Sequence, residues 1–513
     1  MTTSTPTSAS APQTAESGGG KGLKTGALGL LASIVIGIAS TAPAYSLAAS
    51  IGLVSEEVGV KAPLIMIVAF VPILFISYAY RALNSRIPDC GTNFTWGARA
   101  FGPHVGWMSG WGAIIAQVIV LANLAQIAGI YSFKLVGADG LADSVGWVAL
   151  AGSIWLFLMT YIAYRGIEVS ARLQVVLLAL ELVVLLIFSV VSLVEVYNGS
   201  AGGQAIKPAF DWFNPFSGLT GAGLSAGVLV AIFAYWGWDT CVSTNEETEN
   251  SAVTPGRSAV ISTLLLVVTY VLVTVATQAV AGVGTDGFGL GNPDNSGEAL
   301  SPVAGVVLGS FWGKALILAV LSSSAASAQT TILPAARSTL AMAAYKALPR
   351  RFAHVHPRFQ TPSFSTWTMG VVAIVFYVAL SFIKDGAYLG DLILCLGFLI
   401  AWYYGITGFA SVWFFRRELG RSFKDLLLKG VLPLLGGIML LAAFIKSAYD
   451  LYTGESATTI FGIAGAFVLG IGSLVLGVVL MVIYNIVRPA YFRGDVVPGA
   501  DVEIHDDASV RNP

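Results

Sequence analysis

The stretch GIASTAP, Gly37 to Pro43, interrupts the first long apolar segment of the chain near the depth at which a helix would cross the bilayer centre. Proline removes an intrahelical hydrogen bond and clashes with the preceding turn, so a continuous helix is disfavoured here. A second interruption, FAYWGWD from Phe233 to Asp239, places a glycine, bulky aromatic residues and an acid inside another apolar segment. Irregular backbone at this depth is tolerated only where protein buries it or where it lines a cavity. Paired interruptions are typical of secondary transporters with inverted repeats; the alternative is that Gly and Pro merely kink two continuous helices.

The composition is that of a polytopic membrane protein. Of the 513 residues, 56% are hydrophobic and 11% are Asp, Glu, Lys or Arg, whereas soluble domains contain about 25% charged residues. This excludes an ordinary soluble enzyme. The net charge of −1 provides no basic excess for nucleic acid. The three cysteines are scattered and the four histidines lie outside the apolar runs, so we expect neither a metal site nor a cofactor.

About a dozen apolar stretches are long enough to cross a roughly 30 Å hydrocarbon core as helices. We place twelve membrane helices at 28–53, 61–80, 104–132, 146–164, 171–195, 219–241, 257–281, 302–342, 365–383, 388–415, 430–448 and 460–487. With these boundaries, 21 of the 27 Lys and Arg residues, including every arginine, fall on one side. Because positive residues concentrate in cytoplasmic loops, this asymmetry predicts that both termini are cytoplasmic.

The two ends of the chain differ from the apolar part. Residues 1–24 are rich in Ser, Thr, Ala, Pro and Gly, a composition that cannot bury enough apolar surface to offset its ordering entropy. They are predicted to form a disordered cytoplasmic tail. Residues 488–513 contain five acids between Asp495 and Asp507 and are predicted to form an acidic cytoplasmic tail. The sequence does not indicate what either tail does.

Three stretches resemble segments of one family, the amino acid/polyamine/organocation permeases. FAYWGWDTCVSTNEETEN, Phe233 to Asn250, is similar to that family's sixth helix and the loop after it. LNSRIPDCGTNFTWGARAFGPHVGWMSGW, Leu83 to Trp111, is similar to the segment joining the second and third helices. SAQTTILPAARSTLAMAAYKALPRRFAHVHPRFQTP, within Ala326 to Pro362, is similar to the eighth helix and the loop beyond it. The resemblance covers roughly residues 25 to 490.

This resemblance implies an all-α leucine-transporter-type fold with broken helices 1 and 6. The first inverted repeat would occupy residues 25–200, the second 210–415, and two extra helices 430–487. It also implies alternating access, with the substrate at the two breaks. Family members usually carry a Gly-Ser/Thr-Gly-Ile-Phe-like break, whereas this chain has Ala39-Ser40-Thr41-Ala42-Pro43. The backbone contacts and the substrate class therefore stay open.

The breaks suggest how a substrate would be held. A half-helix that starts at mid-membrane presents unpaired N–H groups and the positive end of its dipole, which suits a carboxylate. Carbonyl groups that end the other half-helix accept hydrogen bonds from an ammonium group, so the two breaks together match an α-amino acid. The predicted substrate-binding residues are Ile38, Ala39, Ser40, Thr41, Ala42, Asn123, Gln126, Phe233, Ala234, Tyr235, Trp236 and Trp238. The alternatives are packing for the two tryptophans and helix-to-helix hydrogen bonding for Asn123 and Gln126.

Only two carboxylates lie well inside the predicted spans, and each costs roughly 2.5–3.5 kcal/mol to insert. Asp239 either orients the second broken helix or contacts the substrate. Glu181 lies where some proton-driven members of the resembled family carry a lysine. Because loss of hydration favours the neutral carboxyl group, Glu181 is our candidate proton carrier. The alternatives are an internal ion pair, or a sodium site formed by Glu181 with the hydroxyl groups of Ser323, Ser324 or Ser327.

The sequence thus predicts a permease that imports amino acids across the cytoplasmic membrane by alternating access, with proton symport. Exchange of amino acids or polyamines, sodium symport and nutrient sensing remain alternatives, and neutral, cationic and polyamine substrates are not ranked. An enzyme is disfavoured because no nucleophile has a base near it in sequence. A channel is disfavoured because no ring of repeated polar groups is evident. The oligomeric state is not indicated.

Overall fold

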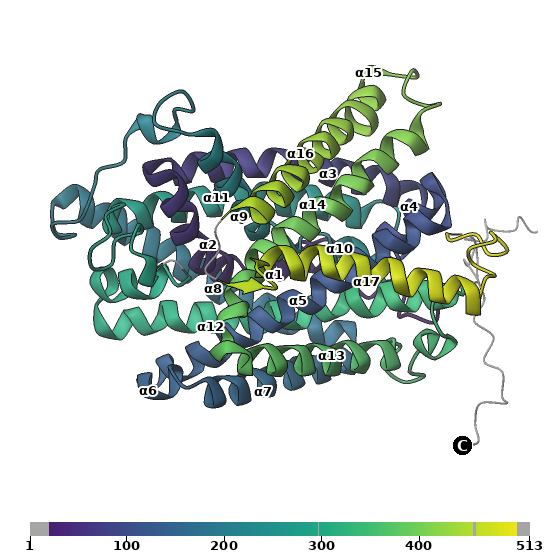
Figure 1. The fold of residues 1–513 in the computed structure, drawn as a ribbon, viewed down its shortest axis with the longest axis horizontal. Helices are drawn as coiled ribbons and strands as arrows, with labels where there is room; N and C mark the ends of the chain where they lie inside the picture. Colours follow the sequence, from purple (N-terminus) through teal and green to yellow (C-terminus); the bar gives the residue numbers. More distant parts are fainter. Residues whose placement is uncertain (1–19, 296, 455–457, 500–513) are drawn as a thin grey trace, which may run out of the picture.

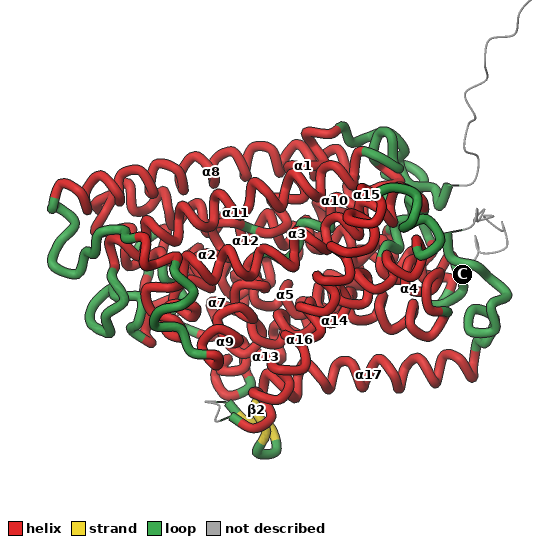
Figure 2. The backbone as a smooth tube through the Cα atoms, turned by 90° about the horizontal axis from the view of Figure 1, so that it is seen from above, coloured by secondary structure: helices red, strands yellow, loops and turns green. Residues whose placement is uncertain are grey.

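The computed structural model describes residues 20–295, 297–454 and 458–499, and helices dominate the described part. The long helices run roughly parallel, and most loops gather at the two ends of the bundle (Figures 1 and 2). The helices are α1 (Leu30–Thr41), α2 (Pro43–Val58), α3 (Ala62–Arg86), α4 (Asn93–Phe101), α5 (Pro103–Leu135), α6 (Asp139–Ala142), α7 (Val145–Arg165), α8 (Ile167–Asn198), α9 (Gly221–Ala234), α10 (Thr240–Ser243), α11 (Thr254–Ala281), α12 (Leu300–Ala344), α13 (Ser363–Phe382), α14 (Ala387–Phe415), α15 (Phe423–Asp425), α16 (Leu432–Thr453) and α17 (Gly465–Val487). Two short strands, β1 (Thr459–Ile460) and β2 (Ile463–Ala464), pair in antiparallel fashion.

Each of the twelve predicted spans coincides with one or two of these helices. In the described part of the chain, ten helical stretches are long and apolar enough to cross a membrane, and two further apolar helices are shorter. The all-helical, polytopic architecture is therefore confirmed, and the number of crossings stays a prediction. Two local differences appear. Residues 460–464, placed in the last span, belong instead to the β1–β2 hairpin, and the segment before α5 forms a separate helix, α4. A left-handed Gly102, with φ 93°, ends α4 and allows the chain to turn into α5.

The first break separates α1 from α2 at a single residue, Ala42. Its φ of 49° and ψ of 67° are left-handed, a conformation that costs a non-glycine residue energy. Pro43 follows as the first residue of α2. Because proline has no N–H and a fixed φ, it suits a helix start and cannot continue the helix before it. The chain therefore stops one helix and begins another at this point, as the sequence predicts.

The second break is longer and lies directly against the first. α9 ends at Ala234 and α10 begins at Thr240, with a left-handed Gly237, φ 112°, between them. A Cβ atom at Gly237 would lie 2.5 Å from the carbonyl oxygen of Ser40. Only glycine allows the two backbones to approach so closely. Two segments far apart in sequence are thus in contact where both helices are interrupted.

We expect Gly237→Ala to lower the midpoint of thermal unfolding, because the new Cβ meets the Ser40 carbonyl and the left-handed backbone is strained, at a cost of about 1–3 kcal/mol. The matched control is Gly146→Ala in α7, where an added Cβ meets nothing within 4 Å. Thermal unfolding of both purified variants, followed by intrinsic fluorescence, makes the comparison. Equal midpoints for the two variants would contradict the close approach of the breaks.

Candidate functional site

Most of the predicted substrate-binding residues are buried around the two breaks, and Gln126 is half-buried. Side chains link the breaks directly. The hydroxyl groups of Ser40 and Thr240 lie 2.7 Å apart, and the Ser327 hydroxyl donates to the Ser40 carbonyl at 2.9 Å. The Tyr270 hydroxyl donates to the Ala234 carbonyl at the end of α9, at 2.7 Å. These contacts bring α1, α9, α10, α11 and α12 to one place.

Glu181 of α8 lies at the start of α2. Its carboxylate accepts the Ala44 N–H at 2.5 Å and the Ser323 hydroxyl at 2.8 Å. The Ala42 cap of α2 makes no side-chain hydrogen bond of its own. A negative carboxylate at a helix start interacts favourably with the helix dipole and with the otherwise unpaired N–H groups. Glu181 therefore caps α2 from a different helix, and Ser323 extends this cap.

The cap occupies the N–H groups that begin α2. Pro43 has no N–H, Ala44 bonds to Glu181, and the Tyr45 N–H donates to the Ser323 hydroxyl at 3.3 Å. A substrate carboxylate that used this helix start would have to replace Glu181 and Ser323. Of the other predicted coupling hydroxyl groups, Ser327 faces the first break, whereas Ser324 donates to a carbonyl of its own helix at 3.0 Å.

Asp239 is held by tyrosines. Its carboxylate accepts the Tyr404 hydroxyl at 2.9 Å and the Tyr80 hydroxyl at 3.4 Å. The rings of Tyr80, Trp238 and Tyr404 pack within 4.9–5.7 Å of one another, centre to centre. These contacts support the structural alternative for Asp239. The sequence analysis missed both tyrosines, because nothing around Tyr80 or in the run AWYYG, 401–405, indicates a contact with a distant acid.

Some of the remaining predicted residues form hydrogen bonds within the protein, and others have a polar group without a partner. Asn123 accepts the Tyr45 hydroxyl and donates to the Leu389 carbonyl at 3.2 Å, so it links α5 to α2 and α14. Trp236 donates to the Tyr403 hydroxyl. Within the described residues, the buried hydroxyl of Tyr235 and indole N–H of Trp238 have no hydrogen-bond partner. Buried polar groups are usually paired, so these two are available to a ligand.

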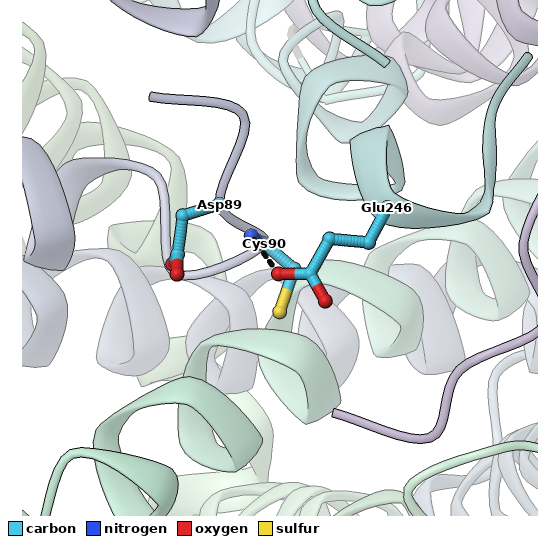
Figure 3. Close-up of side chains that lie close together, drawn as sticks. All are labelled: Asp89, Cys90 and Glu246. Carbon is cyan, nitrogen blue, oxygen red and sulfur yellow. Dashed lines mark hydrogen bonds between the residues drawn. The ribbon is translucent and has the colours of Figure 1, made fainter. Parts of the chain in front are cut away.

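A second cluster lies where the described N-terminus meets the loops, and we call it the Lys21 cluster: Lys21, Asp89, Cys90, Glu246 and Tyr345. Figure 3 shows Asp89, Cys90 and Glu246 converging from the α3–α4 loop and the segment after α10. The spacing of their oxygen and sulfur atoms, within 4.8 Å, would suit a cation. The Lys21 amine takes that place, because it donates to Asp89 at 2.8 Å and to Glu246.

This cluster corrects one prediction. The predicted tail of residues 1–24 lies mostly outside the described residues, but Lys21 and Leu23 at its end are each only 6% exposed. The cause is electrostatic. Burial opposes ionisation of Asp89, yet Lys21, followed by hydrogen bonds from Thr95 and Tyr345, holds its pKa below the usual value. A buried lysine between two carboxylates fixes a segment that composition alone predicts to be free.

The chain after Lys21 is hydrogen-bonded to the loop that follows the second break. The N–H groups of Ala27 and Leu28 donate to the Glu247 carbonyl at 2.8 and 3.1 Å. The Glu247 carboxylate in turn accepts two hydrogen bonds from Arg337 of α12, at 2.5 and 2.8 Å, and both side chains are buried. The start of α1, the loop after α10 and α12 are therefore held together at the Lys21 end of the bundle.

The predicted C-terminal tail of residues 488–513 also falls partly inside the fold. Residues 500–513 lie outside the described residues. Tyr491 is fully buried, and its hydroxyl donates to the Pro103 carbonyl at 2.9 Å. The segment just after α17 therefore packs against the start of α5, because its two aromatic residues, Tyr491 and Phe492, join a buried apolar cluster.

Comparison with known proteins identifies the family. A family model described as "Amino acid permease" matches residues 28–471. A branched-chain amino acid permease, BcaP, of Lactococcus lactis is 26% identical over 398 residues, 74% of this chain and 81% of that protein. Cationic amino acid transporter 4, vacuolar, of Arabidopsis thaliana is 26% identical over 70% of this chain and 59% of that protein. The methylthioribose transporter of Bacillus subtilis is 27% identical over 58% of this chain and 62% of that protein.

These relatives are transporters and not enzymes, in agreement with the sequence analysis. The family match includes both breaks, Glu181 and Arg337, and it extends over most of the chain. The protein belongs to the amino acid permease family, within the amino acid/polyamine/organocation superfamily.

Proposed function

We propose that this amino acid transporter imports a neutral amino acid across the cytoplasmic membrane by alternating access, in symport with a proton. The observation that carries the proposal is the position of Glu181, whose carboxylate caps α2 at the first break. A substrate carboxylate at this break and the Glu181 carboxylate need the same N–H donors. Coupling of a proton to the substrate follows from this competition.

Ionised Glu181 excludes a substrate carboxylate in two ways. It occupies the Ala44 N–H and, through Ser323, the Tyr45 N–H, and its charge repels a second carboxylate nearby. A proton on Glu181 removes the charge and weakens its hold on these donors, because hydrogen bonds to charged acceptors are the stronger ones. The proton therefore favours the substrate, and by linkage the substrate favours the proton to the same extent.

The membrane potential makes such coupling effective. One positive charge that crosses 100 mV provides about 2.3 kcal/mol, and each tenfold concentration ratio costs about 1.4 kcal/mol. One proton for each neutral solute therefore sustains roughly fiftyfold accumulation before any pH gradient is added. The proposed coupling thus matches an importer that concentrates its substrate.

The surroundings of the breaks favour a neutral, apolar side chain. Phe233, Trp236 and Trp238 are buried there, and Asp239 is occupied by Tyr404 and Tyr80 rather than open to a second amine. Two of the relatives, from Lactococcus lactis and Bacillus subtilis, are named as branched-chain amino acid permeases. Carbonyl groups near Ile38, Phe233 and Tyr235 remain our candidates for the substrate ammonium group.

Sodium symport is the second candidate. The Glu181 carboxylate and the Ser323 hydroxyl lie 2.8 Å apart, and the Ser327 hydroxyl lies against the Ser40 carbonyl. Carbonyl groups of an unwound helix and nearby oxygen atoms are the usual ligands of a coupled sodium ion. This arrangement offers oxygen ligands without a proton step, so the first experiment must separate the two ions.

Alternating access requires that each end of the bundle close in turn. Ion pairs hold the Lys21 end together, Lys21 with Asp89 and Glu246, and Arg337 with Glu247. We assign this end to the cytoplasm because it holds most of the arginines. The Lys21–Glu246 pair joins the segment before α1 to the loop after the second break, and the Arg337–Glu247 pair joins α12 to the same loop. Movement of the broken helices would therefore have to separate them.

The first test is uptake of labelled leucine, valine and lysine by sodium-free proteoliposomes with an inward proton gradient. We expect accumulation of leucine or valine that a protonophore abolishes. Lysine uptake in its place would move the substrate to a cationic amino acid. Uptake that appears only when external sodium is added would replace the proton by sodium.

Glu181→Gln should retain substrate exchange across the membrane but lose proton-driven accumulation, from roughly fiftyfold to near onefold. Glutamine keeps the size of the side chain and an acceptor oxygen, but it cannot carry the proton. Glu195→Gln, on the same helix α8 and away from the breaks, is the matched control and should accumulate normally. Unaltered accumulation by the Glu181 variant would remove this residue from the mechanism.

Lys21→Ala should open the Lys21 end. Burial, followed by the Glu246 carboxylate, raises the pKa of the Cys90 thiol, so this cysteine should react slowly with a thiol reagent in the wild type. Breaking a buried pair costs about 3–5 kcal/mol, and we expect Cys90 alkylation to accelerate about tenfold or more, as located by peptide mass spectrometry.

The control for this measurement is Lys24→Ala. Lys24 pairs with Glu168 at 2.7 Å, but both side chains are more than 40% exposed, and exposed pairs contribute only about 0–1 kcal/mol. Its Cys90 alkylation should stay at the wild-type rate. Slow alkylation in both variants would show that the Lys21 cluster does not hold this end closed.

A further inference from the structure

A cavity of about 1100 Å³ opens at the Lys21 end, between the end of α12, the 3₁₀ turn Arg350–Ala353 and the end of α17. It takes no part in the transport site described above. Five basic side chains line it, and Asp495 is the single acidic lining residue among the described residues. The basic residues are Lys346, Arg350, Arg351, Arg488 and Arg493.

The backbone around this cavity is well anchored. α12 ends in a turn with a left-handed Lys346, φ 61°, closed by a hydrogen bond of 2.7 Å from the Ala347 N–H to the Met342 carbonyl. This geometry is the Schellman motif, which fixes the direction of the chain leaving a helix. The indole N–H of buried Trp107 donates to the Ala347 carbonyl at 3.1 Å. The α12 side of the cavity is therefore held in place by hydrogen bonds.

The positive charge of the cavity is largely uncompensated. Within the described residues, Lys346, Arg351, Arg488 and Arg493 form no ion pair. Some basic residues elsewhere at this end are paired, such as Lys21 with Asp89 and Arg86 with Glu418. Clustered cations without carboxylate partners attract an anion, and arginines suit a phosphate oxygen in particular.

The position of α17 indicates which anion. This helix lies along one edge of the bundle (Figure 2), and its outer surface is apolar. Ile486 and Val487 are 77% and 64% exposed, and Arg488 follows them directly. Tyr484, one turn earlier, lines the cavity. The apolar surface thus ends where the cationic cavity begins, as at the boundary between acyl chains and headgroups.

We propose that this cavity binds the headgroup of an anionic phospholipid, with the phosphate among Arg351, Arg488 and Arg493 and the acyl chains along α17. Basic pockets between membrane helices at the cytoplasmic surface bind such headgroups. The proposal rests on the cytoplasmic assignment of the Lys21 end, but not on the substrate or the coupling ion. Because its test measures lipid binding, failure of transport would leave it intact.

The test compares lipid retention by native mass spectrometry after purification from mixed phosphatidylglycerol and phosphatidylcholine. Wild-type protein should retain phosphatidylglycerol selectively. The triple variant Arg351→Gln, Arg488→Gln, Arg493→Gln should lose this retention by about tenfold or more. The matched control Arg358→Gln, Arg417→Gln, Arg421→Gln removes the same charge from exposed positions outside the cavity and should retain the lipid.

Asp495→Asn removes the negative charge of the one acidic residue among the described residues that line the cavity, so it should increase phosphatidylglycerol retention. Misfolding would lower retention and could not produce this increase. Equal loss in both triple variants would overturn the proposal in favour of general surface attraction. Displacement of the lipid by millimolar inorganic phosphate would also overturn it, in favour of a free-phosphate site. Retention by the triple variant of the cavity, with a normal unfolding midpoint, would exclude the cavity altogether.

Discussion

A helix start inside the bundle requires partners for its N–H groups, and the candidate site is arranged around this constraint. Pro43 forces α2 to begin at the first break, and Ala42 provides no side chain that can cap it. Glu181 and Ser323, from α8 and α12, provide the cap instead. Three helices that are distant in sequence are thus tied at the point where the backbone is least regular.

The sequence predicts the parts of this arrangement that are local. Proline at a helix start, a run with Gly237 and the apolar length of each span act within a few residues, so both breaks and the helices coincide with their predicted positions. Glu181 is also found from sequence, because a carboxylate at this depth is costly. Its partners are not, since the contacts to Ala44 and Ser323 join residues separated by well over a hundred positions. No local pattern shows which helices are neighbours.

Sequence-based predictions are least accurate for charged residues whose partners lie far away in the sequence. The composition of residues 1–24 predicts a solvated tail, yet Lys21 is buried because two carboxylates from other segments surround it. Asp239 resembles a functional acid by its depth alone, whereas Tyr404 and Tyr80 supply the donors that it needs. In both cases the partners lie far away in the sequence, and nothing in the sequence around them indicates the contact.

The two intramembrane acids therefore differ in what a proton would change. Asp239 accepts hydrogen bonds from neutral phenol groups, which can rotate to donate to another acceptor or to accept a hydrogen bond themselves. Protonation of Asp239 would therefore change a local hydrogen-bond network without freeing a helix end. Glu181 accepts a backbone N–H, which cannot turn away and has no other acceptor once the carboxylate withdraws. Neutralising Glu181 therefore weakens the hydrogen bond that this buried donor makes. A charged substrate carboxylate is a stronger acceptor for the same donor, so we infer that the acid that caps this break is suited to couple the two solutes.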